Sequence, residues 1–77
     1  MGREQYNKII NNAKTTLDKG ILEKITEFKY KELDGYYVIE VYVKANIKAK
    51  EMGEIITNIE EYAKGYGLNI LVDFLRG

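Results

Sequence analysis

The segment Thr26–Val43, TEFKYKELDGYYVIEVYV, joins two β-rich runs through the dipeptide Asp34-Gly35. An Asp-Gly pair favours a two-residue type I′ turn, because both central residues of that turn need a positive φ. The sequence therefore predicts a β-hairpin whose turn closes between Leu33 and Tyr36. Such a tight turn also fixes which residues face each other across the two strands.

The predicted pairing divides the hairpin side chains between two faces. The face toward the core carries Tyr30 opposite Ile39, Phe28 opposite Val41 and Thr26 opposite Val43. The other face carries Lys31 opposite Val38, Lys29 opposite Glu40, Glu27 opposite Tyr42 and Ile25 opposite Lys44. This second set holds most of the charges, including opposite charges side by side, so we expect it to face water.

The beginning of the first strand departs from this alternation. Even-numbered residues point to the core from Thr26 onward, whereas the apolar Ile21 and Ile25 are odd-numbered. Two explanations are open: the strand begins late, or a β-bulge intervenes.

Apolar residues at helical spacing predict one helix before the hairpin and one after it. The first covers residues 3–19 with Gly20 as its C-terminal cap, and the second covers about residues 47–64 with Asn46 as its N-cap. The apolar stripes are Tyr6, Ile10, Ala13 and Leu17 in the first helix and Ala49, Met52, Ile56, Ile59 and Ala63 in the second. Gly53 interrupts the second helix, and a close approach of the first helix explains it better than a binding notch.

Residues 68–75 alternate between apolar and mixed positions and predict a third strand. The crossover through the second helix makes this strand parallel to the second strand, residues 36–43, which is apolar on both faces as a central strand should be. We therefore expect an α+β fold with the order α-β-β-α-β. It forms a two-layer sandwich whose three-stranded mixed sheet, in the order 1-2-3, carries both helices on one face. The order 2-1-3 is the alternative, and residues 1–77 make a single domain.

The composition argues against catalysis. The chain has no His, Cys, Ser, Trp or Pro, and its 12 basic residues balance 12 acidic ones. General acid–base chemistry usually uses His, and nucleophilic chemistry usually uses Ser or Cys beside a base. The carboxylates do not converge on one position. We therefore expect no catalytic residue, no metal site and no cofactor.

The sequence also bears on location. It contains no apolar run of the length needed to cross a bilayer, and its beginning lacks the pattern of a secretory signal. A cytoplasmic protein without a membrane partner is the expectation.

The sheet face turned away from the helices is the favoured binding surface. Its apolar residues are expected to form one patch with a charged frame: Tyr36, Val38 and Tyr42 from the second strand, Ile25 from the first, and Leu71 and Leu75 from the third. Aromatic residues inside a polar rim are typical of protein interfaces. Scattered apolar side chains on an open sheet face are the simpler alternative.

Four lysines offer a second candidate surface. Lys24, Lys44, Lys48 and Lys50 gather at the open end of the hairpin, beside the beginning of the second helix. Phosphate groups of RNA or DNA are the ligand that such a corner would bind, but the balanced net charge and the lack of interleaved Arg or aromatic residues disfavour it. The element order resembles that of several unrelated families: the ring-building motif of secretion and sporulation ring proteins, the alkaline-shock-type small domains, and a KH-related fold. The KH resemblance requires a Gly-x-x-Gly loop between two helices, and Lys50-Glu51-Met52-Gly53 does not supply one.

These observations favour a small non-catalytic protein-interaction module: an inhibitor, an adaptor or a self-assembling domain. It would dock through the outer sheet face or an edge strand, onto a partner protein, onto further copies of itself, or onto both. Small size and the lack of catalytic groups suit a protein encoded by a phage or a mobile element. A small RNA- or DNA-binding protein is the alternative.

Overall fold

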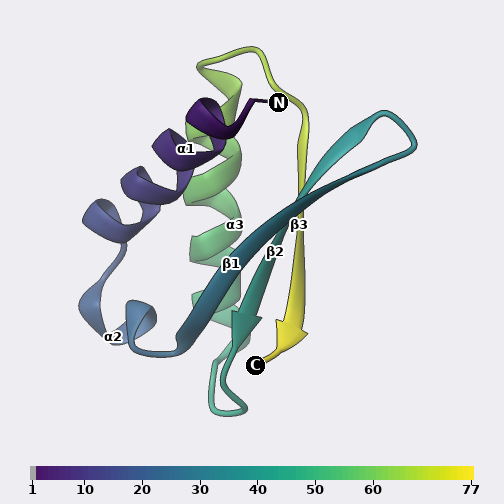
Figure 1. Cartoon of the computed structure of the whole chain (residues 1–77). Coiled ribbons are helices and arrows are strands. Elements are labelled where there is room, and N and C mark those ends of the chain that lie inside the picture. Colours follow the sequence, from purple (N-terminus) through teal and green to yellow (C-terminus); the bar gives the residue numbers. More distant parts are fainter. Residues whose placement is uncertain (1) are drawn as a thin grey trace.

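The computed structural model describes residues 2–77 and contains the elements in the predicted order, with one short helix added (Figure 1). Their bounds are α1 (Arg3–Thr16), α2 (Lys19–Leu22), β1 (Ile25–Leu33), β2 (Tyr36–Val43), α3 (Ala49–Lys64) and β3 (Ile70–Arg76). The strands form one mixed sheet in the order β1-β2-β3, in which β1 is antiparallel and β3 is parallel to β2. The predicted α+β fold and the sheet order 1-2-3 are confirmed.

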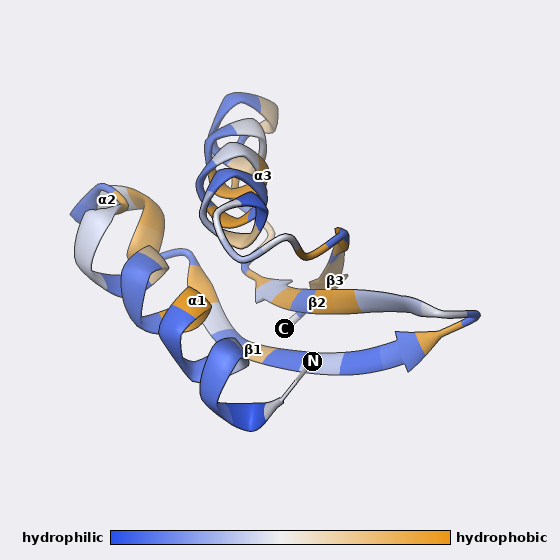
Figure 2. Ribbon diagram, turned by 90° about the horizontal axis from the view of Figure 1, so that it is seen from above, coloured by the Kyte–Doolittle hydropathy of each residue, from blue (hydrophilic) through white to orange (hydrophobic). Residues whose placement is uncertain are grey.

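The two long helices lie on the same side of the sheet, which gives the molecule two layers (Figure 2). The core between the layers is aliphatic and comprises Ile9, Ile10, Ala13, Ile21, Ile39, Val41, Val43, Ile55, Ile59, Ala63 and Ile70. Full burial of one large aliphatic side chain stabilises a protein by about 1.5–3 kcal/mol. The central strand β2, which supplies Ile39, Val41 and Val43, therefore ties the sheet to both helices.

The hairpin turn has the geometry that the sequence predicts. Asp34 has a φ of 50° and Gly35 a φ of 82°, and neither peptide bond is cis. Leu33 pairs with Tyr36, and the predicted register continues without a shift back to residue 27. The hairpin end extends past the helical layer (Figure 1), so its side chains reach beyond the core.

A β-bulge at Thr26 changes the register at the beginning of β1. Ile25 pairs with Val43, and the shift lies between Ile25 and Glu27. The predicted pairs of Thr26 with Val43 and of Ile25 with Lys44 are therefore wrong. The bulge turns the apolar Ile25 toward the core, where it packs half-buried, and leaves the exposed Thr26 to donate a hydrogen bond from Oγ1 to the carbonyl oxygen of Tyr42 at 3.1 Å.

Helix α1 ends at Thr16, three residues before the predicted end. The hydroxyl of Thr16 donates to the carbonyl oxygen of Asn12 at 2.6 Å, and Leu17 is extended with a φ of −72° and a ψ of 148°. The chain then turns through α2, which brings Ile21 into the core with 4% of its surface exposed. Gly20 consequently lies inside α2 and is not the cap of α1.

The second long helix begins later than predicted, and Lys48 takes the N-cap position that was expected for Asn46. The Glu51 carboxylate explains this boundary, because its Oε1 accepts a hydrogen bond from the Lys48 backbone N–H at 2.8 Å. At the other end, Gly67 adopts a φ of 71° and the Leu68 N–H donates to the carbonyl of Ala63 at 3.1 Å. Because of this turn, β3 begins at Ile70 and not at the predicted residue 68.

Six residues of the hairpin were expected on the core side. Of these, Val43 is buried and Thr26, at the bulge, is exposed. Ile39 and Val41 are fully buried, and Phe28 packs half-buried against the core. Tyr30 is 36% exposed, and the centre of its ring lies 4.8 Å from that of Tyr6 on α1. The expected burial of Tyr30 is therefore wrong. β1 is an edge strand, so no neighbouring strand covers the ring on the side away from β2.

Replacement of Gly53 by Ala is expected to stabilise the protein by about 1 kcal/mol, because Gly inside a helix loses more backbone freedom than Ala. A Cβ at Gly53 would meet no atom within 4 Å, so the predicted close approach of the first helix is wrong and the added methyl group has room. Urea unfolding measures the change.

Gly67→Ala is the matched control for this prediction. The φ of 71° at Gly67 disfavours a side chain, so Ala there is expected to destabilise the protein by about 1–2 kcal/mol. A Gly53→Ala protein that unfolds at lower urea than the unmodified protein would contradict the prediction.

Candidate functional site

The outer sheet face, which points away from both helices, carries five of the six residues predicted for protein binding. The strand register places them on this face together with Leu33, which the sequence interpretation missed: Tyr36, Val38 and Tyr42 from β2, and Leu71 and Leu75 from β3. Leu33 has a sequence signal, because it faces Tyr36 directly across the predicted turn.

Four of these residues form what we call the hairpin-end patch: Leu33, Tyr36, Val38 and Leu71. Leu33 is 54%, Tyr36 51% and Leu71 50% exposed. Val38 is only 5% exposed, because in the central strand it lies between Lys31 of β1 and Leu71 of β3. The predicted exposure of Val38 is therefore wrong, and this residue forms the floor of the patch.

A row of charged residues separates this patch from Tyr42 and Leu75. Lys29, Glu40 and Asp73 lie side by side on β1, β2 and β3. On the far side of this row, Tyr42 and Leu75 are half-buried, and Lys29 Nζ lies 5.2 Å from the centre of the Tyr42 ring. The six predicted residues therefore do not make one continuous patch.

Ile25 is the residue that the structure removes from the predicted surface. The bulge at Thr26 shifts it into register with Val43, and its side chain packs against the core. Glu27 keeps its predicted outer position opposite Tyr42. Because the face loses the apolar Ile25, its charged residues make up a larger share of it than the sequence indicated.

The hairpin-end patch borders a shallow hollow of about 310 Å³. Its lining combines Leu33, Val38 and Leu71 with the charged side chains of Lys31 and Asp73. Lys31 Nζ also lies 3.3 Å from a carboxylate oxygen of Glu40. An apolar floor with charges at its rim is a composition typical of protein interfaces.

The four predicted nucleic-acid-binding lysines do not act as one basic patch. Lys24 Nζ contacts both carboxylate oxygens of Glu51, at 2.8 and 3.0 Å, and both side chains are largely buried. This ion pair neutralises Lys24 locally. Lys44, Lys48 and Lys50 are exposed at the same end of the molecule.

The Lys24–Glu51 pair affects the pKa of the Glu51 carboxyl. The hydrogen bond from Lys24, followed by the one from the Lys48 backbone, holds the pKa of the Glu51 carboxyl below its ordinary value of 4.5. The same carboxylate therefore caps α3 and binds Lys24, which lies in the turn before β1, to it. One of the four lysines, Lys24, therefore links the chain before β1 to the beginning of α3.

Within residues 2–77, no three His, Cys, Asp or Glu side chains come together in a way that would hold a metal ion. No helix in the same range has the length and apolarity to cross a membrane. Comparison with known proteins finds no matching family model, no similar curated protein and no similar solved structure.

Substitution Glu51→Gln is expected to weaken the acid dependence of stability. A carboxyl whose folded pKa is lowered adds stability above its unfolded pKa, here about 4.5, and loses it as the pH falls through the lower folded value. Gln keeps an oxygen that can accept the Lys48 N–H bond but has no charge for Lys24. Thermal unfolding from about pH 6 to about pH 3 measures the difference.

The exposed Glu61, also on α3, provides the matched control as Glu61→Gln. This variant is expected to keep the acid dependence of the unmodified protein. Equal pH profiles for the Glu51 and Glu61 variants would contradict the role of the Lys24–Glu51 pair.

The double substitution Lys44→Glu with Lys48→Glu is expected to leave nucleic-acid binding unchanged and weak. Three exposed lysines on a chain of zero net charge give little long-range attraction to phosphates. Fluorescence anisotropy with mixed RNA and DNA fragments at physiological salt is the measurement. Submicromolar binding that the double substitution abolishes would reverse this conclusion.

Proposed function

We propose that this protein is a non-catalytic interaction module that docks its outer sheet face onto a second copy of the chain. The observation that carries the proposal is the hairpin-end patch, where Leu33, Tyr36 and Leu71 are each about half exposed around the buried Val38. Large apolar side chains around a buried floor, with charges at the rim, are the composition of a protein interface.

The charges on this face favour a second copy as the partner. Lys29 and Lys31 lie on β1 at one edge of the sheet, whereas Asp73 lies on β3 at the other. Suppose that the two outer faces meet and that a two-fold axis parallel to β2 runs between them. The half-turn about this axis then places β1 of one copy over β3 of the other. In that arrangement Lys29 of each copy approaches Asp73 of the second copy, so the same contact occurs twice.

The same arrangement also brings the apolar residues of the central strand together. Sheets that pack face to face keep their strands within about 30° of each other and lie about 10 Å apart. The central positions then meet their own equivalents, so that Val38 faces Val38 and the two Tyr36 side chains lie near each other. Glu40 also faces Glu40, and Lys31 of the same chain, 3.3 Å away, offsets its charge. For a chain of 77 residues with a small core, the added burial also supports the fold.

The test is a charge exchange between the two edges. Asp73→Lys is expected to weaken self-association about tenfold, because it replaces two attractive contacts with two repulsive ones. Adding Lys29→Asp to the same chain restores the opposite charges and is expected to recover the association. Sedimentation equilibrium across a range of protein concentrations measures the dissociation constant, and circular dichroism confirms that each variant folds.

Glu61→Lys on α3 is the matched control, because it makes the same change of charge on an exposed residue of the helical layer. It is expected to leave association unchanged. A protein that stays monomeric up to about 1 mM, or an Asp73→Lys variant that associates as tightly as the unmodified chain, would overturn the proposal.

A further inference from the structure

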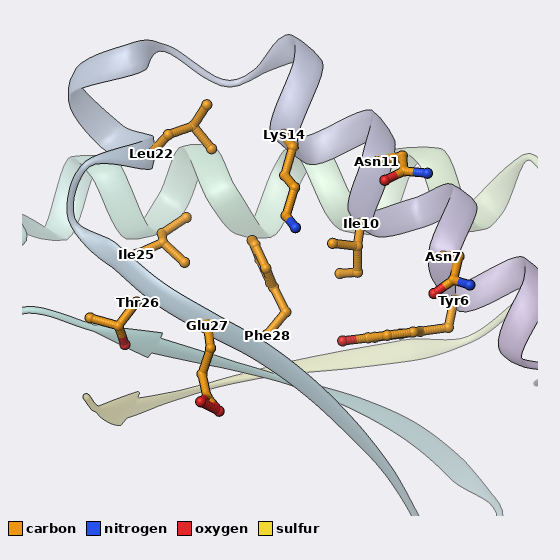
Figure 3. A pocket seen from close by; sticks show the side chains of 10 residues that line it. All are labelled: Tyr6, Asn7, Ile10, Asn11, Lys14, Leu22, Ile25, Thr26, Glu27 and Phe28. Carbon is orange, nitrogen blue, oxygen red and sulfur yellow. The ribbon is translucent and has the colours of Figure 1, made fainter.

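A groove runs between α1 and the free edge of the sheet, on a different surface from the outer face. Its larger part is a hollow of about 500 Å³ whose apolar wall includes Ile10, Ile25 and Phe28 (Figure 3). The side chains of Phe28 and Lys14 both point into this space from opposite layers, whereas Glu27 points away from α1 (Figure 3). The groove therefore has an apolar wall with a cation above it.

The groove continues along β1 toward the hairpin. A second hollow of about 420 Å³ shares Tyr6 with the first and is bordered by Arg3 and Tyr30. The groove thus follows β1 from Ile25 to Tyr30, with Lys14 beside one part and Arg3 beside the other. Within residues 2–77, neither of these two cations has a carboxylate within ion-pair distance.

The strand that borders this groove has unused backbone groups. β1 pairs only with β2, so one edge of it is free. In a two-residue hairpin the residues that flank the turn exchange both backbone hydrogen bonds, and the pattern then alternates along the strand. Leu33 and the odd-numbered residues before it therefore bond to β2, whereas Phe28, Tyr30 and Glu32 turn their N–H and C=O groups to the free edge.

We propose that this groove binds an extended acidic segment of another protein, which joins β1 as a fourth strand. Backbone hydrogen bonds to Phe28, Tyr30 and Glu32 hold the segment, as in other cases of strand addition. Alternate side chains of the segment point toward α1. An apolar side chain fills the hollow against Phe28, and acidic side chains on either side of it approach Lys14 and Arg3.

A single segment fits this edge better than a second folded copy. The N-terminal half of α1 reaches past β1 on the side away from β2 (Figure 2). A second copy that paired its own β1 here would bring its own α1 against this overhang. An extended segment has no helix and can pass between α1 and the edge. About five to six residues span the groove at about 3.3 Å per residue.

The probe is a fluorescent peptide with the sequence Thr-Glu-Thr-Leu-Thr-Glu-Thr, which presents acid, apolar and acid on one face when extended. Fluorescence anisotropy is expected to show binding, and the backbone amide signals of Phe28, Tyr30 and Glu32 are expected to shift in NMR spectra. Lys14→Glu and Arg3→Glu are each expected to weaken binding about tenfold, as the loss of one charge-assisted contact does. Lys50→Glu, on α3 and outside the groove, is the matched control and is expected to bind as the unmodified protein does.

Two altered peptides separate the contributions. Replacement of both Glu by Lys is expected to abolish binding through charge. In the second peptide, the backbone nitrogens that face β1 are methylated. This change removes their hydrogen bonds to β1, leaves the side chains unchanged, and is also expected to abolish binding. Equal binding of either altered peptide, no binding of the acidic peptide at about 1 mM, or shifts confined to the outer face would overturn the proposal.

The test also distinguishes this groove from the outer face. Asp73→Lys is expected to bind the peptide normally, because Asp73 lies on the opposite edge of the sheet. If the amide signals of Phe28 and Tyr30 shift with protein concentration in the absence of peptide, a second copy occupies the edge and the segment proposal is wrong.

Discussion

The positive φ angles at Asp34 and Gly35 are the constraint on which the other features of this structure depend. Two consecutive residues in this conformation close the hairpin with two residues, and a two-residue turn leaves no freedom in the register. A slip of one position would turn Ile39 and Val41, both fully buried, toward water and bring Glu40 inward. The division of β2 into a core face and an outer face follows from that turn, and so does the outward direction of the free backbone groups on β1.

The sequence predicted well what depends on periodicity and local turn chemistry. The hairpin pairing from Leu33 back to Glu27, the central position of β2 and the parallel β3 all agree with the structure. Each rests on a pattern repeated over several residues, or on a turn that few dipeptides adopt.

The boundaries and exposures were harder to predict, because they depend on partners distant in the chain. The bulge at Thr26 exists because Ile25 reaches the core. α3 begins at Ala49 because Glu51 accepts from the Lys48 N–H and from Lys24, which lies in the turn before β1. The composition of the outer sheet face differed from prediction for the same reason. The burial of Val38 requires both neighbouring strands, and no single strand pattern reports it.

The same reasoning explains why the groove beside β1 left no sequence signal. Ile10 and Lys14 lie on α1 and Phe28 on β1, and each fits an ordinary amphipathic helix or an alternating strand. They form one surface because α1, which packs against α3, reaches past the β1 edge of the sheet (Figure 2). Side-chain periodicity within one element does not determine the offset between two layers.

The two proposed surfaces lie on different parts of the same sheet: one is its outer face and the other is its β1 edge. Docking of the outer face acts along the normal to the sheet, whereas strand addition acts within its plane, so one does not occupy the other. In the face-to-face arrangement about an axis parallel to β2, each β1 lies over the β3 of the second copy, and the two free β1 edges lie on opposite sides of the dimer. A dimer of this kind presents two grooves. A partner with two acidic segments, joined by a linker long enough to reach around the dimer, would then bind more tightly than either segment alone, because the second contact becomes intramolecular.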